Sequence, residues 1–280
     1  MVIPDEPYTL ATVDYGGTPC HWSQNTTGDN GAFLNAVVLS AASGVPVAAN
    51  DISCYGSTAK SATSQGACSF SNSAAGYWIT GVLYTAVGTT NSAAKAAVQN
   101  LTAVFAANSA SAAASNTSAA PAAPAGVWSH TADCDGISTT SKVATALASP
   151  GLKVQDSDTE PGEMPGGYAA SLRAAGVYAC AWGQTASTVP AGQIAEFTAT
   201  VLPGGGSLST VVAALPGASS VQVTGAAHSY VLSDAQLSTD LDVFAGSNML
   251  QLNFDKSATV ARMSSAASSL IAALDAGESN

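Results

Sequence analysis

Two Ala-rich stretches of the chain repeat apolar side chains at helical spacing. The first covers residues 92–107, and its apolar positions are Ala96, Val98, Leu101, Val104 and Phe105. The second covers residues 257–276, with apolar positions at Val260, Met263, Ala267, Leu270, Ile271 and Leu274. Because residues three and four apart share one face of a helix, each stretch predicts an amphipathic helix with one side suited to burial.

The segments that precede these predicted helices alternate between apolar and polar residues, as half-buried strands do. Residues 33–39 and 197–202 each predict a strand that runs into a Gly- and Ser-rich segment. Residues 68–84 and 241–254 each contain two alternating runs around a Gly-, Ser- or Asn-containing turn, which is the pattern of a β-hairpin. The chain therefore predicts an antiparallel sheet followed by a helix, twice over.

A Cys-x-Trp-x-Gln motif also occurs twice, as CHWSQ at residues 20–24 and as CAWGQ at residues 180–184. The predicted strands, hairpin and helix follow each motif in the same order. We therefore expect the α+β class, with two tandem copies of one domain in which helices pack on one face of an antiparallel sheet. Since residues two apart on a strand share a face, we expect Trp22 and Trp182 to pack in the core against Cys20 and Cys180.

A low-complexity segment rich in Ala, Ser and Pro, residues 108–127, separates the two copies. Such a composition cannot bury a core and predicts a semi-extended linker. We therefore place the first domain at residues 1–107 and the second at residues 128–280. Two domains also agree with a length of 280 residues.

The second copy has an opening that the first copy lacks. Asp133, Cys134, Asp135 and Gly136 lead into a predicted helix at residues 141–148. If the copies are homologous, the first copy starts part-way into its domain. The expectation is that the chain is a fragment of a longer precursor in which the first copy has its own opening helix.

The five cysteines form no Cys-x-x-Cys pair and no Cys/His spacing suited to zinc, which favours disulfides in an oxidising compartment. We favour pairing of Cys54 with Cys68 in the first copy and of Cys134 with Cys180 in the second. Cys20 is then unpaired, and by analogy its partner would be an upstream cysteine that matches Cys134. A nucleophilic role for Cys20 beside His21 is disfavoured, because adjacent residues on a strand point to opposite faces.

Composition excludes several classes of function. Only 9% of the residues are charged, and a net charge of -11 comes with seven Lys and Arg in the whole chain. So few cations cannot neutralise phosphates, so we expect no binding to nucleic acid or to anionic membranes. The sequence also has no apolar run long enough for a membrane span, and its start lacks a signal-peptide pattern. We expect an extracellular or cell-surface protein whose signal or anchor is absent from this chain.

The Asp-Cys-Asp at residues 133–135, followed by Cys180 and Trp182 and then a sheet, resembles the small extracytoplasmic lipoprotein and sensor-like domains of actinobacteria. In the first copy the resemblance rests on Cys20 and Trp22 alone. It implies a surface-anchored binding or sensing module and brings no catalytic residue with it. The loop bounded by residues 54 and 68 is a departure from these families.

An acidic loop is the one candidate metal site. It places four carboxylates within eight residues, as calcium loops do: Asp156, Asp158, Glu160 and Glu163. The loop departs from the EF-hand pattern, because Pro161 stands where the glycine belongs and Gly167 where the bidentate glutamate belongs. A solvated acidic loop is the favoured interpretation, and we expect no cofactor.

Tyr77 and Trp78 are the candidate ligand-binding residues, because adjacent rings on a strand point to opposite faces and one of them is available at the surface. We assign no catalytic residue, since His21, His130 and His228 have no G-x-S-x-G elbow near them. We expect a non-enzymatic module that binds a small-molecule or protein ligand. The alternatives are a self-associating structural component of the cell surface and a secreted hydrolase.

Overall fold

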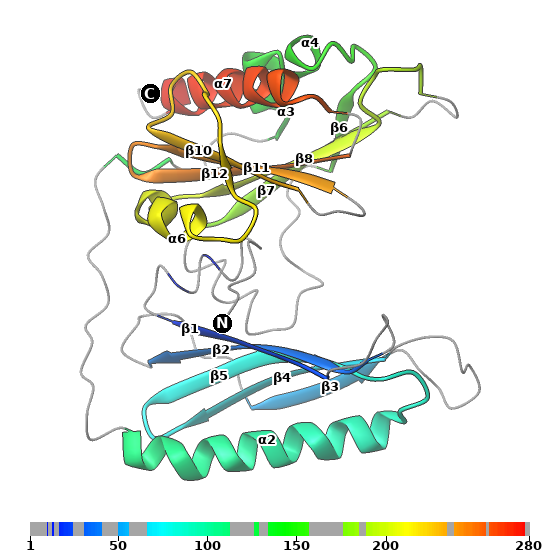
Figure 1. The fold of residues 1–280 in the computed structure, drawn as a ribbon, viewed down its shortest axis with the longest axis vertical. Helices are drawn as coiled ribbons and strands as arrows, with labels where there is room; N and C mark the ends of the chain where they lie inside the picture. Colours follow the sequence, from blue (N-terminus) through cyan, green and yellow to red (C-terminus); the bar gives the residue numbers. More distant parts are fainter. Residues whose placement is uncertain are drawn as a thin grey trace. The chain divides into compact units, whose positions relative to one another are not determined.

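The chain folds into two compact units, each with its own antiparallel sheet (Figure 1). The structure, a computed structural model, describes residues 10, 13, 17–24, 31–40, 50–55, 66–112, 126–128, 134–156, 176–184, 189–233, 238–255 and 258–277. Described residues up to Ala112 belong to the first unit, and those from Gly126 to Gly277 belong to the second. Two antiparallel sheets with several helices and two disulfides place the chain in the α+β class, as expected.

The first unit contains a five-stranded sheet and one long helix. The elements are β1 (Thr18–Ser23), β2 (Phe33–Ser40), β3 (Asp51–Tyr55), β4 (Ala67–Ala74), β5 (Tyr77–Tyr84) and α2 (Asn91–Ala112). The strand order is β1-β2-β5-β4-β3, and every neighbouring pair is antiparallel. The β4–β5 hairpin, predicted from the alternation in residues 68–84, is present with a two-residue loop at Ala75 and Gly76.

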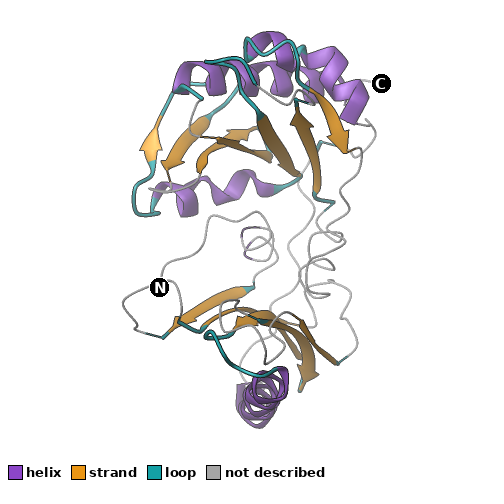
Figure 2. Ribbon diagram, turned by 90° about the vertical axis from the view of Figure 1, so that its right-hand side faces the viewer, coloured by secondary structure: helices purple, strands orange, loops and turns teal. Residues whose placement is uncertain are grey.

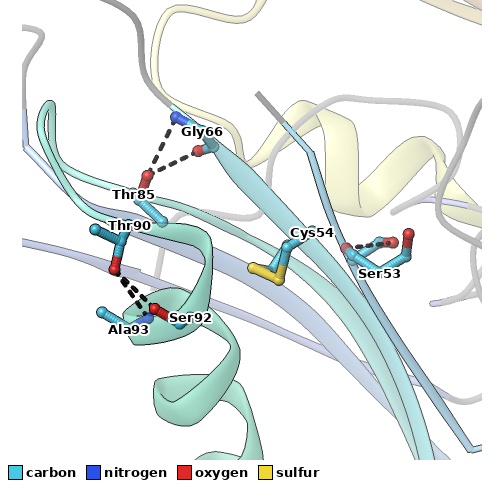
Figure 3. Close-up of a disulfide and its surroundings, with 9 residues drawn as sticks. Ser53, Cys54, Gly66, Thr85, Thr90, Ser92 and Ala93 are labelled. Atoms are coloured by element: carbon cyan, nitrogen blue, oxygen red, sulfur yellow. Dashed lines mark hydrogen bonds between the residues drawn. A yellow bond between two sulfur atoms is a disulfide. The ribbon is translucent and has the colours of Figure 1, made fainter. Parts of the chain in front are cut away.

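Three local interactions stabilise the end of this sheet from which the chain continues into α2 (Figure 3). A disulfide joins Cys54 to Cys68, which are direct partners across β3 and β4. Thr85 follows β5, and its Oγ1 accepts the Gly66 N–H at 3.1 Å, so that the two strand ends are held together. Thr90 caps α2, because its Oγ1 accepts the N–H of Ala93 at 3.2 Å.

Helix α2 shares a buried apolar cluster with one face of the first sheet. Ala94 and Val98 of the helix are buried together with Phe70 of β4 and Ile79 of β5. The helix also continues to Ala112, five residues beyond the end predicted at residue 107 and into the predicted linker. Those residues are Ala, Ser and Asn, and Ala has the highest helix propensity. Because none of them is proline, nothing in residues 108–112 terminates the helix.

The second unit contains a seven-stranded sheet with the order β6-β7-β8-β12-β11-β10-β9. Its strands are β6 (Lys153–Asp156), β7 (Tyr178–Gly183), β8 (Glu196–Leu202), β9 (Ser219–Ser220), β10 (His228–Ser233), β11 (Ser238–Ala245) and β12 (Asn248–Asp255). Its helices are α3 (Cys134–Ser141), α4 (Val143–Ala146), the 3-10 helix η2 (Gly205–Leu208), α6 (Ser209–Ala213) and α7 (Val260–Gly277). The β11–β12 hairpin predicted from residues 241–254 is present.

Helical segments lie on both faces of the second sheet (Figure 2). Leu270 of α7, Ile137 of α3 and Leu147 near α4 share one buried cluster with Val201 and Leu250. The expectation of helices on one face only is therefore incomplete. A Cβ at Gly205 of η2 would meet Leu202 and Met249, which neighbour Val201 and Leu250 along the strands and so point to the opposite face.

The five strands of the first sheet and five adjacent strands of the second have the same chain order, spatial order and register. The first sheet runs β1-β2-β5-β4-β3, and the second contains β7-β8-β12-β11-β10. Cys20 lies opposite Ala36 and Cys180 opposite Ala199, so each motif strand meets its neighbour in the same way. Both hairpins also close with a two-residue loop, and in each case a long helix follows.

Candidate functional site

The second Cys-x-Trp strand, β7, is covered on all the sides that the structure describes. Cys180 forms a disulfide with Cys134, the first residue of α3, with a Cα–Cα distance of 5.6 Å. Trp182 is 1% exposed and stacks on Phe197 with ring centroids 4.6 Å apart. Strand β6 pairs with the outer edge of β7, and α3 packs against α7 on the face where Trp182 lies. The motif residues Cys180 and Trp182 are therefore part of the structural core of the second unit.

The first Cys-x-Trp strand, β1, has a different environment. Trp22 is 50% exposed, and Cys20 is a free thiol. In the part of the chain that the structure describes, β1 pairs with a neighbour on one side only, β2. The expectation that Trp22 packs in the core is therefore wrong, whereas the same expectation for Trp182 is confirmed. The reason is physical: burial of the tryptophan needs a layer over the strand. In the second unit α3 and β6 supply that layer, whereas in the first unit no described element pairs with the outer edge of β1.

The thiol of Cys20 is poorly suited to nucleophilic chemistry. Partial burial raises the pKa of Cys20 above its usual value, so the reactive thiolate is less populated at neutral pH. The adjacent His21 engages another partner, since its Nδ1 lies 2.5 Å from Oδ1 of Asn35. Its ring also lies 6.3 Å from that of Phe33. No thiol–imidazole pair forms at this strand.

An incompletely buried helix flank belongs to the same unit. Val104 of α2 is 59% exposed, and Leu101 and Phe105 are only partly buried against the core cluster. In the second unit Leu270 and Ala266 of the long helix are almost fully buried and α3 packs against α7, and the exposed apolar residue of this helix is Val260 at its first position, 45% exposed. The first unit thus exposes apolar surface on its long helix as well as on its motif strand.

The residues proposed for ligand contact, Tyr77 and Trp78, begin β5. Trp78 is 1% exposed, and its indole N–H donates to Ser71 Oγ at 2.6 Å. The hypothesis that Trp78 is a surface ligand contact is therefore wrong, because both faces of β5 are buried at this point and the pattern of alternation cannot show that. Tyr77 is half-buried and remains the outer of the two rings.

Of the acidic loop, the structure describes only the first member. Asp156 ends β6, and Asp158, Glu160 and Glu163 lie outside the described residues. Within the described ranges, no group of three or more His, Cys, Asp or Glu side chains is placed to hold a metal ion. Of the three histidines, His228 begins β10 and is exposed, whereas His130 lies outside the described ranges.

One buried polar pair was not anticipated from the sequence. Asp242 is fully buried in β11, and its Oδ1 accepts the Nε2–H of Gln251 on β12 at 2.9 Å. A neighbouring pair, Asp240 and Asn253, repeats the arrangement at the exposed end of the same hairpin. In the sequence, Asp242 occupies an alternating polar position, which predicts exposure. The structure places η2 against β11, which the alternation does not show.

These features leave β1, with Trp22 and Cys20, as the candidate functional site. It is a strand edge that combines an exposed indole with a thiol, and it lies opposite the edge formed by β3. Comparison of the chain with known protein families, with curated proteins and with solved structures gives no match.

Proposed function

We propose that this protein is a non-enzymatic extracytoplasmic module that binds a polypeptide partner through β1 of its first unit. The observation that carries the proposal is the exposure of Trp22 on a strand that, among the described residues, pairs on one side only. An open strand edge presents unpaired backbone donors and acceptors, and an added strand is a common mode of peptide recognition. Tryptophan is also enriched among the residues that dominate binding energy at protein interfaces.

The proposal includes an origin by duplication. The two units are diverged copies of one domain with a helix packed on a sheet. Support comes from the shared order of five strands, from the matched register at Cys20 and Cys180, and from the equal hairpin loops. Unrelated sheets rarely agree in all three respects, because strand order and register are set independently.

Location outside the cytoplasm is supported by the covalent chemistry and by the composition. Two disulfides persist in an oxidising environment and are rare in reducing cytosol. The low content of charged residues and the resemblance of the Asp-Cys-Asp and Cys-x-Trp pattern to extracytoplasmic actinobacterial domains agree with this location. Among the described helices, none combines the length and the apolar character needed to cross a bilayer.

Native mass spectrometry tests the proposed function. The protein is purified from an oxidising compartment of its source, as wild type and as Trp22→Lys. A charge on an edge strand opposes strand addition, so a retained polypeptide should appear on the wild type and be lost from the variant. The matched control is Tyr55→Lys on β3, the opposite edge, which should keep the partner. Bare protein in all three samples, or a hydrolytic activity that depends on a histidine or carboxylate, would contradict the proposal.

A second candidate, self-assembly at the cell surface, is favoured by the same open strand, since two copies of β1 can pair with each other. Light scattering over a hundredfold range of concentration separates the two functions. A binding module stays monomeric, whereas an assembly component shows a mass that rises with concentration and falls back in Trp22→Lys.

A further inference from the structure

The second unit shows what a complete domain of this type places over its motif strand. Residues 134–156 form one continuous segment that begins with Cys134, passes through α3 and α4, and ends in β6. This segment contacts the motif strand twice, through the disulfide to Cys180 and through the pairing of β6 with β7. Trp182 and the flank of α7 are buried beneath it. We call residues 134–156 the covering segment.

The first unit has the counterpart of each surface that the covering segment contacts. Cys20 has the register position of Cys180, and its thiol is free. Trp22 has the position of Trp182 and is half exposed. On α2, Val104 is 59% exposed, whereas α7 of the second unit packs against α3. Among the described residues no element pairs with the outer edge of β1.

We infer that β1 of the first unit is the docking site for a cysteine-bearing helix–strand segment of the same kind as the covering segment. This inference rests on the proposed function and names the chemistry of the partner. The strand of the partner pairs with β1, its apolar helix covers Trp22 and the exposed flank of α2, and the cysteine at the start of its helix forms a disulfide with Cys20. Three separate features of the first unit, a thiol, an indole and a strand edge, are matched by this one occupant.

A second copy of the chain does not supply this occupant. Its own covering segment is fixed within its own second unit, where Cys134 is disulfide-bonded and Ile137 lies in the core. The partner is therefore a segment of matching chemistry other than residues 134–156. It needs a cysteine at the start of an amphipathic helix, a length near that of residues 134–156, and a strand at its end.

The bond forms by thiol–disulfide exchange. The cysteine of the arriving segment is joined to glutathione in a mixed disulfide. This mixed disulfide is the product when a free thiol reacts with oxidised glutathione. Cys20 loses its proton, and its thiolate attacks the sulfur of the segment. A new sulfur–sulfur bond forms while the bond to glutathione breaks, and glutathione leaves as a thiolate that takes up a proton. Partial burial raises the pKa of Cys20 and lowers its thiolate population, which slows exchange with small disulfides. Pairing of the segment with β1 holds its cysteine against Cys20 and favours exchange with the segment.

The test uses the intact, oxidised chain and a synthetic peptide with the sequence of residues 133–156, which carries glutathione on its cysteine. Intact mass should show one peptide attached, and peptide mapping should place it on Cys20. The attachment should be at least tenfold faster than that of a scrambled peptide with the same composition and the same mixed disulfide. Quenching by acrylamide should fall on attachment, because Trp22 is the exposed tryptophan, whereas Trp78, Trp128 and Trp182 are buried.

Two variants define the control and the outcomes. Cys20→Ser should take up no peptide, and Trp22→Lys should react at the rate of the scrambled peptide. Equal rates for the two peptides on wild type, or attachment without protection of Trp22, would show a lone accessible thiol and overturn the inference. A Cys20–Cys20 dimer as the main product would assign the edge to a second copy and also overturn it. If a natural partner is retained in a Trp22-dependent way while the peptide fails, the proposed function stands and this inference alone falls.

Discussion

The side chain of Asn248 binds the backbone of Trp128, 120 residues earlier in the chain: its Oδ1 accepts the N–H of Trp128 at 2.9 Å. Its Nδ2 donates to the carbonyl of Gly126, also at 2.9 Å. Trp128 is held in this way at the edge of the second core, where its indole N–H donates to Asp275 of α7 at 2.9 Å. A single hairpin residue thus fixes the segment through which the chain enters the second unit.

Substitution of Asn248 by Ala should destabilise the second unit by about 2 kcal/mol or more. The substitution leaves the buried N–H of Trp128 without its partner, which costs roughly 1–3 kcal/mol, and it also removes the bond to the carbonyl of the exposed Gly126. Urea unfolding followed by tryptophan fluorescence measures the change. The matched control is Asn253→Ala, an exposed residue of the same strand, which should cost about 0.5 kcal/mol. Equal losses for the two variants would contradict the role assigned to Asn248.

The first unit contains a buried hydrogen bond between β5 and β4 that makes a second prediction. Trp78 donates its indole N–H to Ser71 Oγ, and both residues are at most 5% exposed. Ser71→Ala leaves the indole N–H unsatisfied and should cost about 1–3 kcal/mol of unfolding free energy, whereas Ser69→Ala, in a more exposed bond on the same strand, should cost well under about 1 kcal/mol.

A double-mutant cycle with Trp78→Phe isolates this hydrogen bond. Once the indole N–H is absent, the further substitution of Ser71 by Ala should cost much less than it does in the wild type. Additive losses would show that the bond contributes nothing and that Ser71 matters only for packing.

The sequence predicted the elements better than it predicted their surroundings. The two hairpins and the two long helices follow from periods of two and 3.6 residues, and such a period can be recognised within a short window of sequence. The exposure of Trp22 does not follow, because Trp22 and Trp182 have the same local pattern and differ only in whether a distant segment covers them. Trp78 shows the converse. Its strand reads as alternating, but both of its faces are buried, and periodicity cannot distinguish a covered face from a solvated one.

The candidate site was predictable only in part, for the same reason. The sequence predicted that Cys20 would lack a partner, since the other four cysteines have a pairing that suits the two copies. It could not reveal that the indole two residues away, on the same strand, is half exposed. The burial of Asp242 could not be predicted either, because an acidic residue in an alternating strand predicts a solvated face. The helical segment on that face is short and has little periodicity of its own.

The two disulfides should differ in accessibility and in their effect on stability. Cys134 and Cys180 are both buried, whereas Cys54 is only partly buried on the outer strand β3. Mild dithiothreitol should therefore reduce the bond of Cys54 first, as followed by alkylation and mass spectrometry. Closure of the longer loop in the second unit should contribute about 4 kcal/mol, against about 3 kcal/mol in the first, on the chain-entropy model.

Paired alanine substitutions provide the check on that order. Removal of both cysteines of the second unit should lower its unfolding free energy more than removal of Cys54 and Cys68 lowers that of the first. Reduction of the buried bond before the outer one, or a larger loss in the first unit, would show that local strain or residual structure in the unfolded chain outweighs loop length.

Tyr178 should make the second unit sensitive to alkaline pH. Burial raises the pKa of Tyr178 from its usual 10 to about 12, because the phenolate is poorly solvated in the core that contains Tyr178. The unfolded chain releases this proton first, so its stability relative to the folded state increases once the pH exceeds 10. The tyrosine then lowers the free energy of unfolding by roughly 1 kcal/mol at pH 11, and this loss grows until the folded state ionises near pH 12.

Denaturant unfolding at pH 9, 10 and 11 measures the slope of the unfolding free energy against pH. Tyr178→Phe should flatten it, and Tyr55→Phe, an exposed tyrosine of the first unit, should leave it unchanged. A slope that persists in Tyr178→Phe would mean that other groups dominate alkaline unfolding and that burial of this phenol has no thermodynamic effect.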